Sequence, residues 1–263
     1  EEKGEFLKKE PKAEKFILPL ISAYEFLNGK KRWCLWLIDA EPNELNQMTE
    51  VLKRVELVKK FRLDSVAPST QKFATTPSLF RDKNRPETFI VVPRVSSENR
   101  PYIPIGFFDK SSIVSDTCLS IPDGNQYHFG VLMSKMHMAW VKYICGRLKS
   151  DFRYSKDIVY NNYPFPQGVP VSKFQVVAAA AEAVLQIRAP EQAKGNTLAH
   201  LYDPLTMPLA LQKAHQTLDK AVDKCYRDAP FTTDARRIEY LFTLYEQYTA
   251  GLFAVEKKKK GKK

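Results

Sequence analysis

Three charged residues just past the middle of the chain occupy every second position. They are Lys149, Asp151 and Arg153, separated by Ser150 and Phe152. In an extended segment, residues two apart share a face, so the three charges would lie together on one side. Lysine and arginine donate hydrogen bonds to guanine O6 and N7, and aspartate accepts one from cytosine N4. The spacing therefore predicts either a surface that reads a G·C pair or a strand with an internal salt bridge, Lys149 to Asp151 or Asp151 to Arg153.

Residues that could carry catalysis form no recognisable motif. The sequence has no glycine-rich phosphate loop, no H-E-x-x-H and no G-x-S-x-G. The segment from Asn162 to Phe165 comes nearest to the Asn/Asp-Pro-Pro-aromatic motif of an amino-methyltransferase, but its order is wrong, and we interpret it as a turn. Asp109, Asp116 and Asp123 are scattered, as turn and helix-cap aspartates typically are. We expect no catalytic residue and no enzymatic activity in this chain alone.

Cysteine, histidine and tryptophan are interpreted as core residues. The four cysteines and four histidines are widely spaced, and no C-x-x-C or other metal-ligand spacing occurs, so we predict no metal site. Free cysteine is usually buried, which favours reduced core positions. The three tryptophans have apolar neighbours, which favours the core over a stacking platform for a ligand. These residues are Cys34, Cys118, Cys145 and Cys225, His128, His137, His200 and His215, and Trp33, Trp36 and Trp140.

The formal net charge of +11 is concentrated at one end. The last eight residues contribute +5, which leaves +6 for the body of the chain. That end is typical of a solvated, disordered tail or of an expression remnant. A body charge of +6 is compatible with phosphate binding but equally with solubility. With 44% hydrophobic and 27% charged residues, the composition indicates a soluble globular protein, and we expect neither a membrane span nor a secretory signal.

Strands and helices alternate in the first part of the chain. Short apolar runs bounded by Pro, Gly and polar residues predict strands, and apolar residues at helical spacing predict amphipathic helices. We expect strands at residues 32–39, 88–92, 102–108 and 113–121, and helices at residues 44–61 and 127–148.

A proline-rich segment at residues 161–170 separates this part from a helical one. We expect helices at residues 174–188 and 208–227, and a third that begins after Thr232 or Thr233 and runs to Tyr248. The predicted fold is α+β, with a mixed or antiparallel-sheet domain at residues 1–166 and a small all-helical domain at residues 167–252. Residues 253–263 form the predicted Lys-rich tail. The helical domain is interpreted as a packing module, because its periodic residues suit a core.

Several long segments occur in the order found in one enzyme family. They are Phe26 to Gly29, Arg32 to Asp39, Val92 to Glu98, Arg100 to Gly106, Tyr127 to Leu132, Met136-His137 with Ala139-Trp140, Cys145 to Asp151, Arg153 to Ser155, Val159 to Pro164 and Leu201 to Pro208. Through them nearly the whole chain resembles the MmeI-like type IIG restriction-modification enzymes, which combine an endonuclease with an adenine DNA methyltransferase.

The resemblance implies that the chain is one part of a larger bacterial, cytoplasmic enzyme. In that family one polypeptide carries a nuclease, a helical spacer, a methyltransferase dependent on S-adenosylmethionine, a target recognition domain and a C-terminal helical domain. This chain is similar to the last two only. Its implied partners are double-stranded DNA and the methyltransferase and nuclease domains of the same polypeptide, without a membrane. S-adenosylmethionine and magnesium are expected for the parent enzyme, and no cofactor for this chain.

The resemblance also implies which residues contact DNA. The family places base-reading residues in the segment of Lys149, Asp151 and Arg153, and another at the position of Thr117. With this, base reading is favoured over the internal salt bridge. Other basic residues lie in polar, loop-like stretches and are expected to contact phosphates, although solvated loop charge is an equal alternative. They are Arg81, Lys83, Arg85, Arg94, Arg100, Arg147 and Lys156.

Two other functions stay open from the sequence. The chain could be a structural module that clasps its own enzyme without reading DNA, or an independent enzyme whose site has no recognisable motif. Sequence-selective duplex binding separates the first function from both alternatives.

Overall fold

The structure is a computed structural model that describes the backbone of residues 2–260 and the side chains of residues 2–250. The predicted tail at residues 253–263 therefore lies outside the residues whose side chains are described. The chain divides into two compact units that do not follow its two predicted domains. The first unit contains residues 2–21, Lys31–Glu87 and Asp109–Ser115, and the second contains Ser22–Lys30, Thr88–Phe108 and the residues from Asp116 onward.

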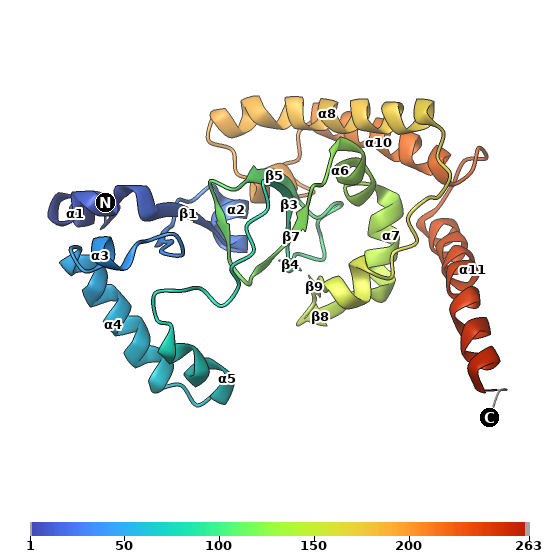
Figure 1. The fold of residues 1–263 in the computed structure, drawn as a ribbon. Helices are drawn as coiled ribbons and strands as arrows, with labels where there is room; N and C mark the ends of the chain where they lie inside the picture. Colours follow the sequence, from blue (N-terminus) through green and yellow to red (C-terminus); the bar gives the residue numbers. More distant parts are fainter. Residues whose placement is uncertain (1, 261–263) are drawn as a thin grey trace. The chain divides into compact units, whose positions relative to one another are not determined.

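The first unit joins short helices to a small sheet (Figure 1). Strand β1 lies between β2, which is antiparallel to it, and β6, which is parallel to it. A small core of Ala13, Phe16, Leu37, Met48 and Val51 holds the helices together. The elements are α1 (Glu2–Lys9), η1 (Pro11–Phe16), β1 (Ile17–Ile21), β2 (Trp33–Leu35), α3 (Pro42–Leu45), α4 (Thr49–Leu63), α5 (Pro68–Gln71), η2 (Lys72–Thr75) and β6 (Ile113–Val114).

The strands of the second unit form two three-stranded sheets. One has the order β5-β3-β7 and the other the order β4-β9-β8. Strand β3 pairs antiparallel with β7, and β9 pairs antiparallel with both β4 and β8. The strands are β3 (Thr88–Pro93), β4 (Val95–Ser96), β5 (Gly106–Asp109), β7 (Cys118–Pro122), β8 (Gly146–Leu148) and β9 (Asp151–Arg153).

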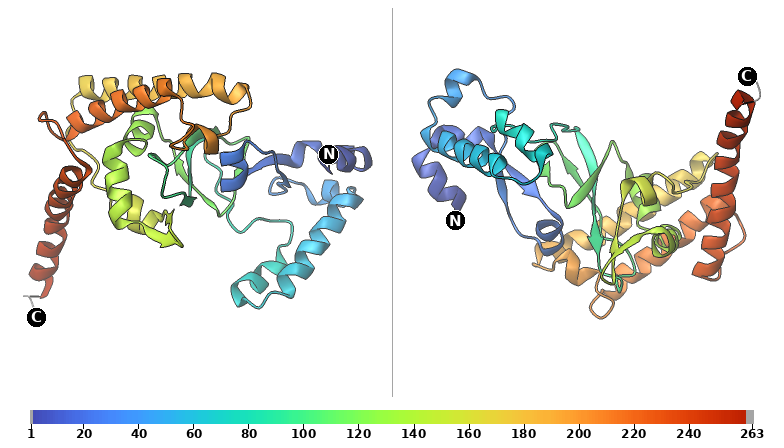
Figure 2. Two further views of the ribbon diagram at one scale, coloured as in Figure 1. Left: turned by 180° about the vertical axis from the view of Figure 1, so that it is seen from behind. Right: turned by 90° about the horizontal axis from the view of Figure 1, so that it is seen from below.

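Most helices of the second unit lie in the second half of the sequence. Helix α8 packs along α10 and α6, and α11 packs against α7 before it runs away from α8 and α10 (Figure 2). None of the described helices is long and apolar enough to cross a membrane. The helices are α2 (Ala23–Asn28), α6 (Gln126–Leu132), α7 (Lys135–Ile144), the π-helix η3 (Lys156–Tyr160), α8 (Val171–Ala193), α9 (Leu198–Leu201), α10 (Leu209–Tyr226) and α11 (Asp234–Lys260).

The α+β fold with a helical C-terminal part is confirmed, whereas several element bounds were wrong. The predicted strand at residues 32–39 is reduced to β2, and the one at residues 102–108 to β5. The predicted strand at residues 113–121 is two strands, β6 and β7, in different sheets. The predicted helix at residues 44–61 is two helices, α3 and α4. An apolar run does not show which strand it will pair with. Parts of one run can therefore belong to different elements or to none.

The predicted helix at residues 127–148 is divided by its own caps. The side chain of Asn125 caps α6, and the hydroxyl of Ser134 accepts a hydrogen bond from the His137 N–H at 3.3 Å and so begins α7. Helix α7 ends where Cys145 takes an extended conformation, and the remaining residues become β8. Side-chain caps satisfy the free N–H groups of a first turn, so they start a new helix inside an apolar run.

The main core lies where α6, α7, α8 and α10 meet. Gly130 of α6 is fully enclosed there, and a Cβ at this position would lie 2.8 Å from Val177 Cγ1 and 3.1 Å from Leu218 Cδ1. These distances are too short for a side chain, so only glycine lets α6 approach both helices. Trp140 is 1% exposed in the same core, and its indole N–H donates to the Val159 carbonyl at 3.0 Å. The helical part of the chain therefore builds one core with the residues before it.

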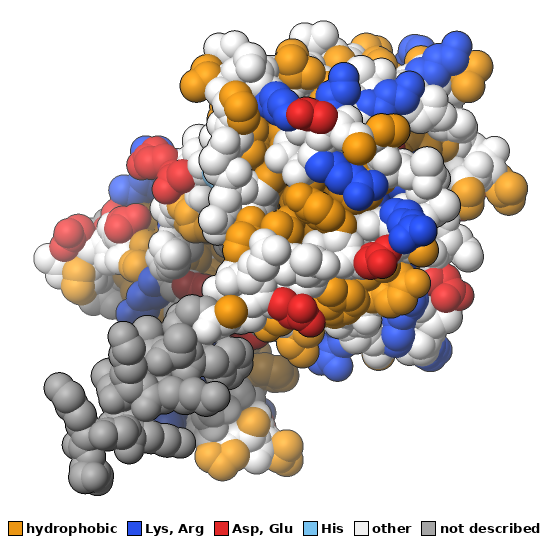
Figure 3. Space-filling model, turned by 90° about the vertical axis from the view of Figure 1, so that its right-hand side faces the viewer, with side chains coloured by type: hydrophobic (Ala, Val, Ile, Leu, Met, Phe, Trp, Pro, Cys, Tyr) orange, Lys and Arg blue, Asp and Glu red, His pale blue; other side chains and the backbone are white. Residues whose placement is uncertain are grey.

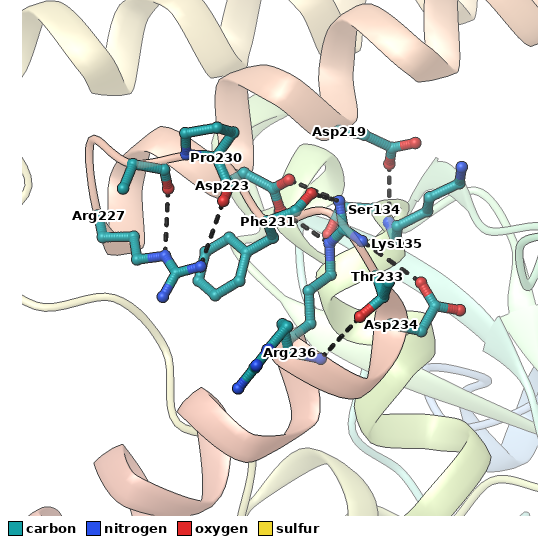
Figure 4. Close-up of polar contacts among 12 residues, drawn as sticks. Ser134, Lys135, Asp219, Asp223, Arg227, Pro230, Phe231, Thr233, Asp234 and Arg236 are labelled. Atoms are coloured by element: carbon teal, nitrogen blue, oxygen red, sulfur yellow. Dashed lines mark hydrogen bonds and ion pairs between the residues drawn. The ribbon is translucent and has the colours of Figure 1, made fainter.

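A buried polar network joins α7, α10 and the first turn of α11 with the loop before it (Figure 4). The Arg237 guanidinium donates to both carboxylate oxygens of Asp223, at 3.1 and 2.6 Å. Asp219 accepts hydrogen bonds from the Lys135 N–H at the start of α7 and from the Tyr102 hydroxyl, both at 2.7 Å. A bidentate arginine-carboxylate pair fixes geometry as well as charge. The two aspartates of α10 thus orient α7 and α11.

Stability should depend on pH through Asp219. Burial raises the pKa of this carboxyl to about 6. Because this pKa is higher in the folded than in the unfolded state, the protonated carboxyl contributes to stability. That contribution is fully present below pH about 4 and is lost as the pH rises through about 6. Asp219→Asn cannot titrate, and its amide can still accept from Lys135 and donate to Tyr102. We expect the variant to gain about 1 to 3 kcal/mol relative to the wild type between pH 4 and pH 7.

Urea denaturation at pH 4.5, 6.0 and 7.5 measures this difference. Two free-energy curves that run parallel across the range would contradict the assignment.

Candidate nucleic-acid interface

The predicted strip of charges lies on a β-hairpin in the second unit. Strands β8 and β9 pair in the register Gly146 opposite Arg153 and Leu148 opposite Asp151, which leaves Lys149 and Ser150 as a two-residue turn. The expectation that the extended segment begins at Lys149 is therefore wrong. Lys149 has a φ of 55°, a left-handed conformation. Two-residue hairpin turns need a positive φ at their first central residue, and they usually place Gly, Asn or Asp there, so Lys-Ser gave no turn signal.

The alternation predicted for the rest of the strip is present in β9. Phe152 is buried at 2% exposure, Asp151 is half-buried and Arg153 is exposed. Since side chains alternate along a strand, Asp151 and Arg153 share the face opposite Phe152. Among the described residues, no ion pair joins Asp151 to Lys149 or Arg153, and the internal salt bridge of the alternative interpretation is not formed. The hairpin thus presents an acceptor and a cation on its outer face, with a second cation at its turn.

Arg147 belongs to the inner side of the hairpin. Its guanidinium lies 4.2 Å from the centre of the Phe152 ring, and it donates to the Ser150 carbonyl at 2.9 Å. It also lies 3.8 Å from a Glu98 carboxylate oxygen. These contacts cover Phe152 and support the turn. The expected phosphate contact of Arg147 stays a prediction, and it would compete with these contacts.

Thr117 lies beside the hairpin although it is distant in sequence. The Arg94 N–H donates to the Thr117 carbonyl at 3.0 Å, and the Arg94 carbonyl accepts from the Tyr154 N–H at 2.7 Å. The Arg94 backbone therefore connects Thr117 to the end of β9. The exposed Thr117 side chain accepts a hydrogen bond from the Ala23 N–H at 3.0 Å. The fold thus brings all four predicted base-reading residues into one unit, with Thr117 and Arg153 on adjoining segments.

Arg94 and Arg100 are not the exposed loop residues that the sequence suggested. Both are half-buried, and the Arg94 Nε has no hydrogen-bond partner among the described residues. Burial lowers the pKa of Arg100, and the nearby carboxylates of Asp151 and Asp203 oppose that effect. Arg100 also approaches the Ser96 hydroxyl at 3.4 Å. It therefore lies against the hairpin at Ser96 of β4, with its charge near the Asp151 carboxylate.

The remaining predicted phosphate contacts are divided between the two units. Arg81, Lys83 and Arg85 lie in the first unit, in the segment between η2 and β3. Arg81 and Lys83 are exposed, whereas Arg85 is half-buried with its guanidinium 5.9 Å from the centre of the Trp36 ring. Lys156 of the second unit is exposed at the start of η3. The three residues of the first unit and Lys156 of the second are each placed only within their own unit. Their contacts with DNA phosphates stay predictions.

A buried aromatic cluster anchors the hairpin, and the sequence analysis did not identify it. The Tyr154 hydroxyl lies 2.9 Å from His137 Nε2, and Tyr163 packs edge-on against the same imidazole. Burial lowers the pKa of His137 to about 3, so the imidazole is neutral at pH 7. The signal was the alternation itself, since Tyr154 continues the inward positions of Phe152. The anchor holds the end of β9 on α7.

Leu148 is a residue of the outer face that the sequence analysis missed. It is 51% exposed opposite Asp151, because the predicted helix that would have buried it ends before β8. No group of three or more His, Cys, Asp or Glu side chains within the described residues is arranged to hold a metal ion. The outer face of the hairpin thus carries the charged, hydrogen-bonding side chains of Asp151 and Arg153 and the apolar side chain of Leu148.

The turn conformation predicts a measurable strain. A left-handed conformation costs most residues about 1 kcal/mol, and asparagine tolerates it better than lysine. We expect Lys149→Asn to raise the free energy of unfolding by roughly 0.5 to 1 kcal/mol. Lys149→Ala is the matched control, because it removes the amine and keeps the strain. Thermal or urea unfolding of both variants tests this, and equal stabilities would show that the turn is unstrained.

Comparison with known proteins gives the relationship of the chain. Residues 1–167 match the family model for the MmeI target recognition domain, and residues 169–253 match the model for the MmeI C-terminal domain. A curated relative, DNA methyltransferase A of Bacillus subtilis (strain 168), is 40% identical over 244 residues. The match covers 92% of this chain and 27% of the relative.

A solved structure gives the same relationship. The type IIL restriction-modification enzyme MmeI, in complex with DNA, matches with a TM-score of 0.90 at 41% identity. That match covers 95% of this chain and 33% of the MmeI chain, so this chain spans a third or less of the length of these relatives. The resemblance inferred from the sequence motifs is confirmed. The chain belongs to the MmeI family of restriction-modification enzymes, of which it carries the target recognition domain and the C-terminal domain.

Proposed function

We propose that this chain recognises a specific double-stranded DNA sequence for a larger restriction-modification enzyme. The observation that supports this most directly is the β8–β9 hairpin, whose outer face carries Asp151 and Arg153 beside the turn residue Lys149. A two-stranded ribbon fits the major groove, where each base pair presents a distinct set of donors and acceptors. The DNA complex of MmeI and the name of the B. subtilis relative agree with this function.

Each residue of the outer face has a defined chemical role in this proposal. Asp151 accepts a hydrogen bond from cytosine N4, and the Lys149 amine donates to O6 or N7 of the paired guanine. Arg153 donates to a neighbouring guanine. The Thr117 hydroxyl can donate or accept, so by itself it selects less strictly. Arg100 lies near Asp151 and adds positive charge beside that carboxylate.

Phosphate contacts supply affinity in this proposal without sequence information. Lys156, Arg81 and Lys83 suit this role best, because their side chains are exposed. Arg85, Arg94, Arg100 and Arg147 have contacts within the protein or lie half-buried, which makes their contribution indirect. On the face drawn in Figure 3, Lys and Arg side chains lie among hydrophobic groups together with Asp and Glu side chains.

The catalytic steps belong to other parts of the parent polypeptide in this proposal. S-adenosylmethionine and magnesium would be bound there, by methyltransferase and nuclease domains in the bacterial cytoplasm. The described residues of this chain hold no acidic or histidine cluster that fits a metal. The label type IIG, which came from the sequence motifs, stays a prediction, since MmeI itself is described as type IIL.

Exchanging two charges tests base reading. In Lys149→Glu with Asp151→Arg the acceptor and donor trade places, so the preferred pair at one position of the target should invert from G·C to C·G. Removal of either residue alone should lose roughly 1 to 3 kcal/mol of discrimination at that position. Sequencing the sites methylated or cut by the full-length enzyme measures both effects.

A matched variant separates base reading from phosphate binding. Lys156→Ala should weaken binding to all duplexes alike and reduce the slope of log K against log salt by about 1. An active double variant with unchanged specificity would refute the assignment of Lys149 and Asp151.

The isolated chain should have no catalytic activity. We expect the 263-residue protein neither to transfer a labelled methyl group to DNA nor to cut plasmid in the presence of magnesium, because its sequence contains no motif for either reaction. The full-length enzyme serves as the positive control. Reproducible incorporation or cleavage that co-purifies with the isolated chain would overturn this expectation and favour an unrecognised active site.

A further inference from the structure

A cleft of about 820 Å³ opens in the first unit, between α1, β2 and α4. Its walls include Phe6, Trp33, Leu35, Leu57 and Val58. Three of them are exposed to solvent, Trp33 at 38%, Leu57 at 67% and Val58 at 37%. Trp33 was expected in the core, and the structure corrects this, because the short strand β2 turns the residue toward the cleft. The cleft is therefore an apolar surface without a cover in this unit.

The exposed apolar surface continues along α4 beyond the cleft. Phe61 follows Leu57 by one helical turn, on the same face, and is 73% exposed. Leu63 and Val66 are 55% and 100% exposed. The main buried cluster of this unit is small, and these large apolar side chains of and after α4 lie outside it, exposed to solvent. Exposed apolar patches of this kind mark interaction sites in soluble proteins.

The charges around the cleft are almost all positive. Lys3, Lys31, Arg32, Arg54 and Arg62 line it, and among the described residues Glu2 is the only acidic one that does so. Arg54 pairs with Glu2 at 2.8 Å, and Arg62 donates to three backbone carbonyls. Lys31 and Arg32 are exposed and form no ion pair among the described residues. The rim therefore suits a partner with apolar side chains flanked by carboxylates.

We propose that this cleft binds an acidic amphipathic segment of the same polypeptide, from the part that lies outside these 263 residues. The matched relatives have room for such a segment, since the matches cover 27% and 33% of their chains. An amphipathic segment that lays its apolar side chains into a groove is a recurrent mode of recognition. This inference rests on the proposed function only in taking the chain as one part of a larger enzyme.

Nucleic acid fits the cleft less well. The Lys3 ammonium lies 3.6 Å from the centre of the Trp33 ring and occupies the face on which a base would stack. Leu57 and Val58 offer no hydrogen bond to a phosphate or a base edge. A protein segment satisfies both the apolar walls and the basic rim.

Hydrogen exchange tests the proposal without any variant. The amides and side-chain surface of residues 49–66 should be covered in the full-length polypeptide and open in the 263-residue chain. We expect exchange in this segment to be roughly tenfold slower in the full-length protein, both without DNA. Equal exchange in the two proteins overturns the proposal.

A photo-crosslinking amino acid at Leu57 of the full-length polypeptide identifies the occupant. The expected product is an intramolecular crosslink to an acidic segment outside the 263 residues. A crosslink to a second copy, or one that forms only with DNA, overturns the proposal. The same amino acid at Leu205, which is 93% exposed in the second unit, is the matched control.

Charge reversal tests the rim. Lys31→Glu with Arg32→Glu should abolish the protection of residues 49–66 in the full-length protein, whereas Lys72→Glu, at an exposed lysine of η2 outside the cleft, should leave it unchanged. Unchanged circular dichroism of the 263-residue chain shows that the double variant folds. Protection that survives the double reversal overturns the role of the rim. Base selectivity is measured separately, so its failure with intact protection contradicts the proposed function and not the docking cleft.

Discussion

The burial of Phe152 and Tyr154 is the constraint on which the candidate interface depends. Strand β9 has three residues and two neighbours of two and three residues, too little backbone pairing to fix a register alone. The two buried aromatic side chains fix the register instead. Arg147 covers Phe152, and His137 lies within hydrogen-bond distance of the Tyr154 hydroxyl. Once both point inward, Asp151 and Arg153 must point outward, since a slip of one residue would exchange the two faces.

The electrostatics of the hairpin follow from that arrangement. The outer charges are too far apart for mutual ion pairs, while the half-buried Arg100 lies near Asp151. A cation near a carboxylate favours its negative charge, and a base edge needs that carboxylate as a hydrogen-bond acceptor. The positive φ of Lys149 follows from the same hairpin, because Lys149 and Ser150 form its two-residue turn. Strain of this kind is typical of functional positions that the surrounding fold can hold.

The helical C-terminal part supports this interface because it shares its core. Helices α8 and α10 pack on α6 at Gly130, and Asp219 and Asp223 of α10 orient α7 and α11. Helix α7 in turn carries His137 and Trp140, which hold the segment after β9. The family models divide the chain near residue 168, whereas the compact units divide it elsewhere. A sequence boundary therefore need not be a packing boundary when two domains bury one another's apolar faces.

The sequence by itself determined the α+β class, the long C-terminal helices and the family, because helical periodicity and ordered motifs are local signals. It also determined that Asp151 and Arg153 share a face, since alternation is a property of any strand. Only the tertiary structure decided that Lys149 is a turn residue, that Arg100 lies against the hairpin and that Thr117 lies beside it. The same holds for Trp33, which its apolar neighbours placed in a core and the fold places at a cleft. Pairing partners, turn conformation and burial depend on residues far apart in the chain, and no local pattern contains them.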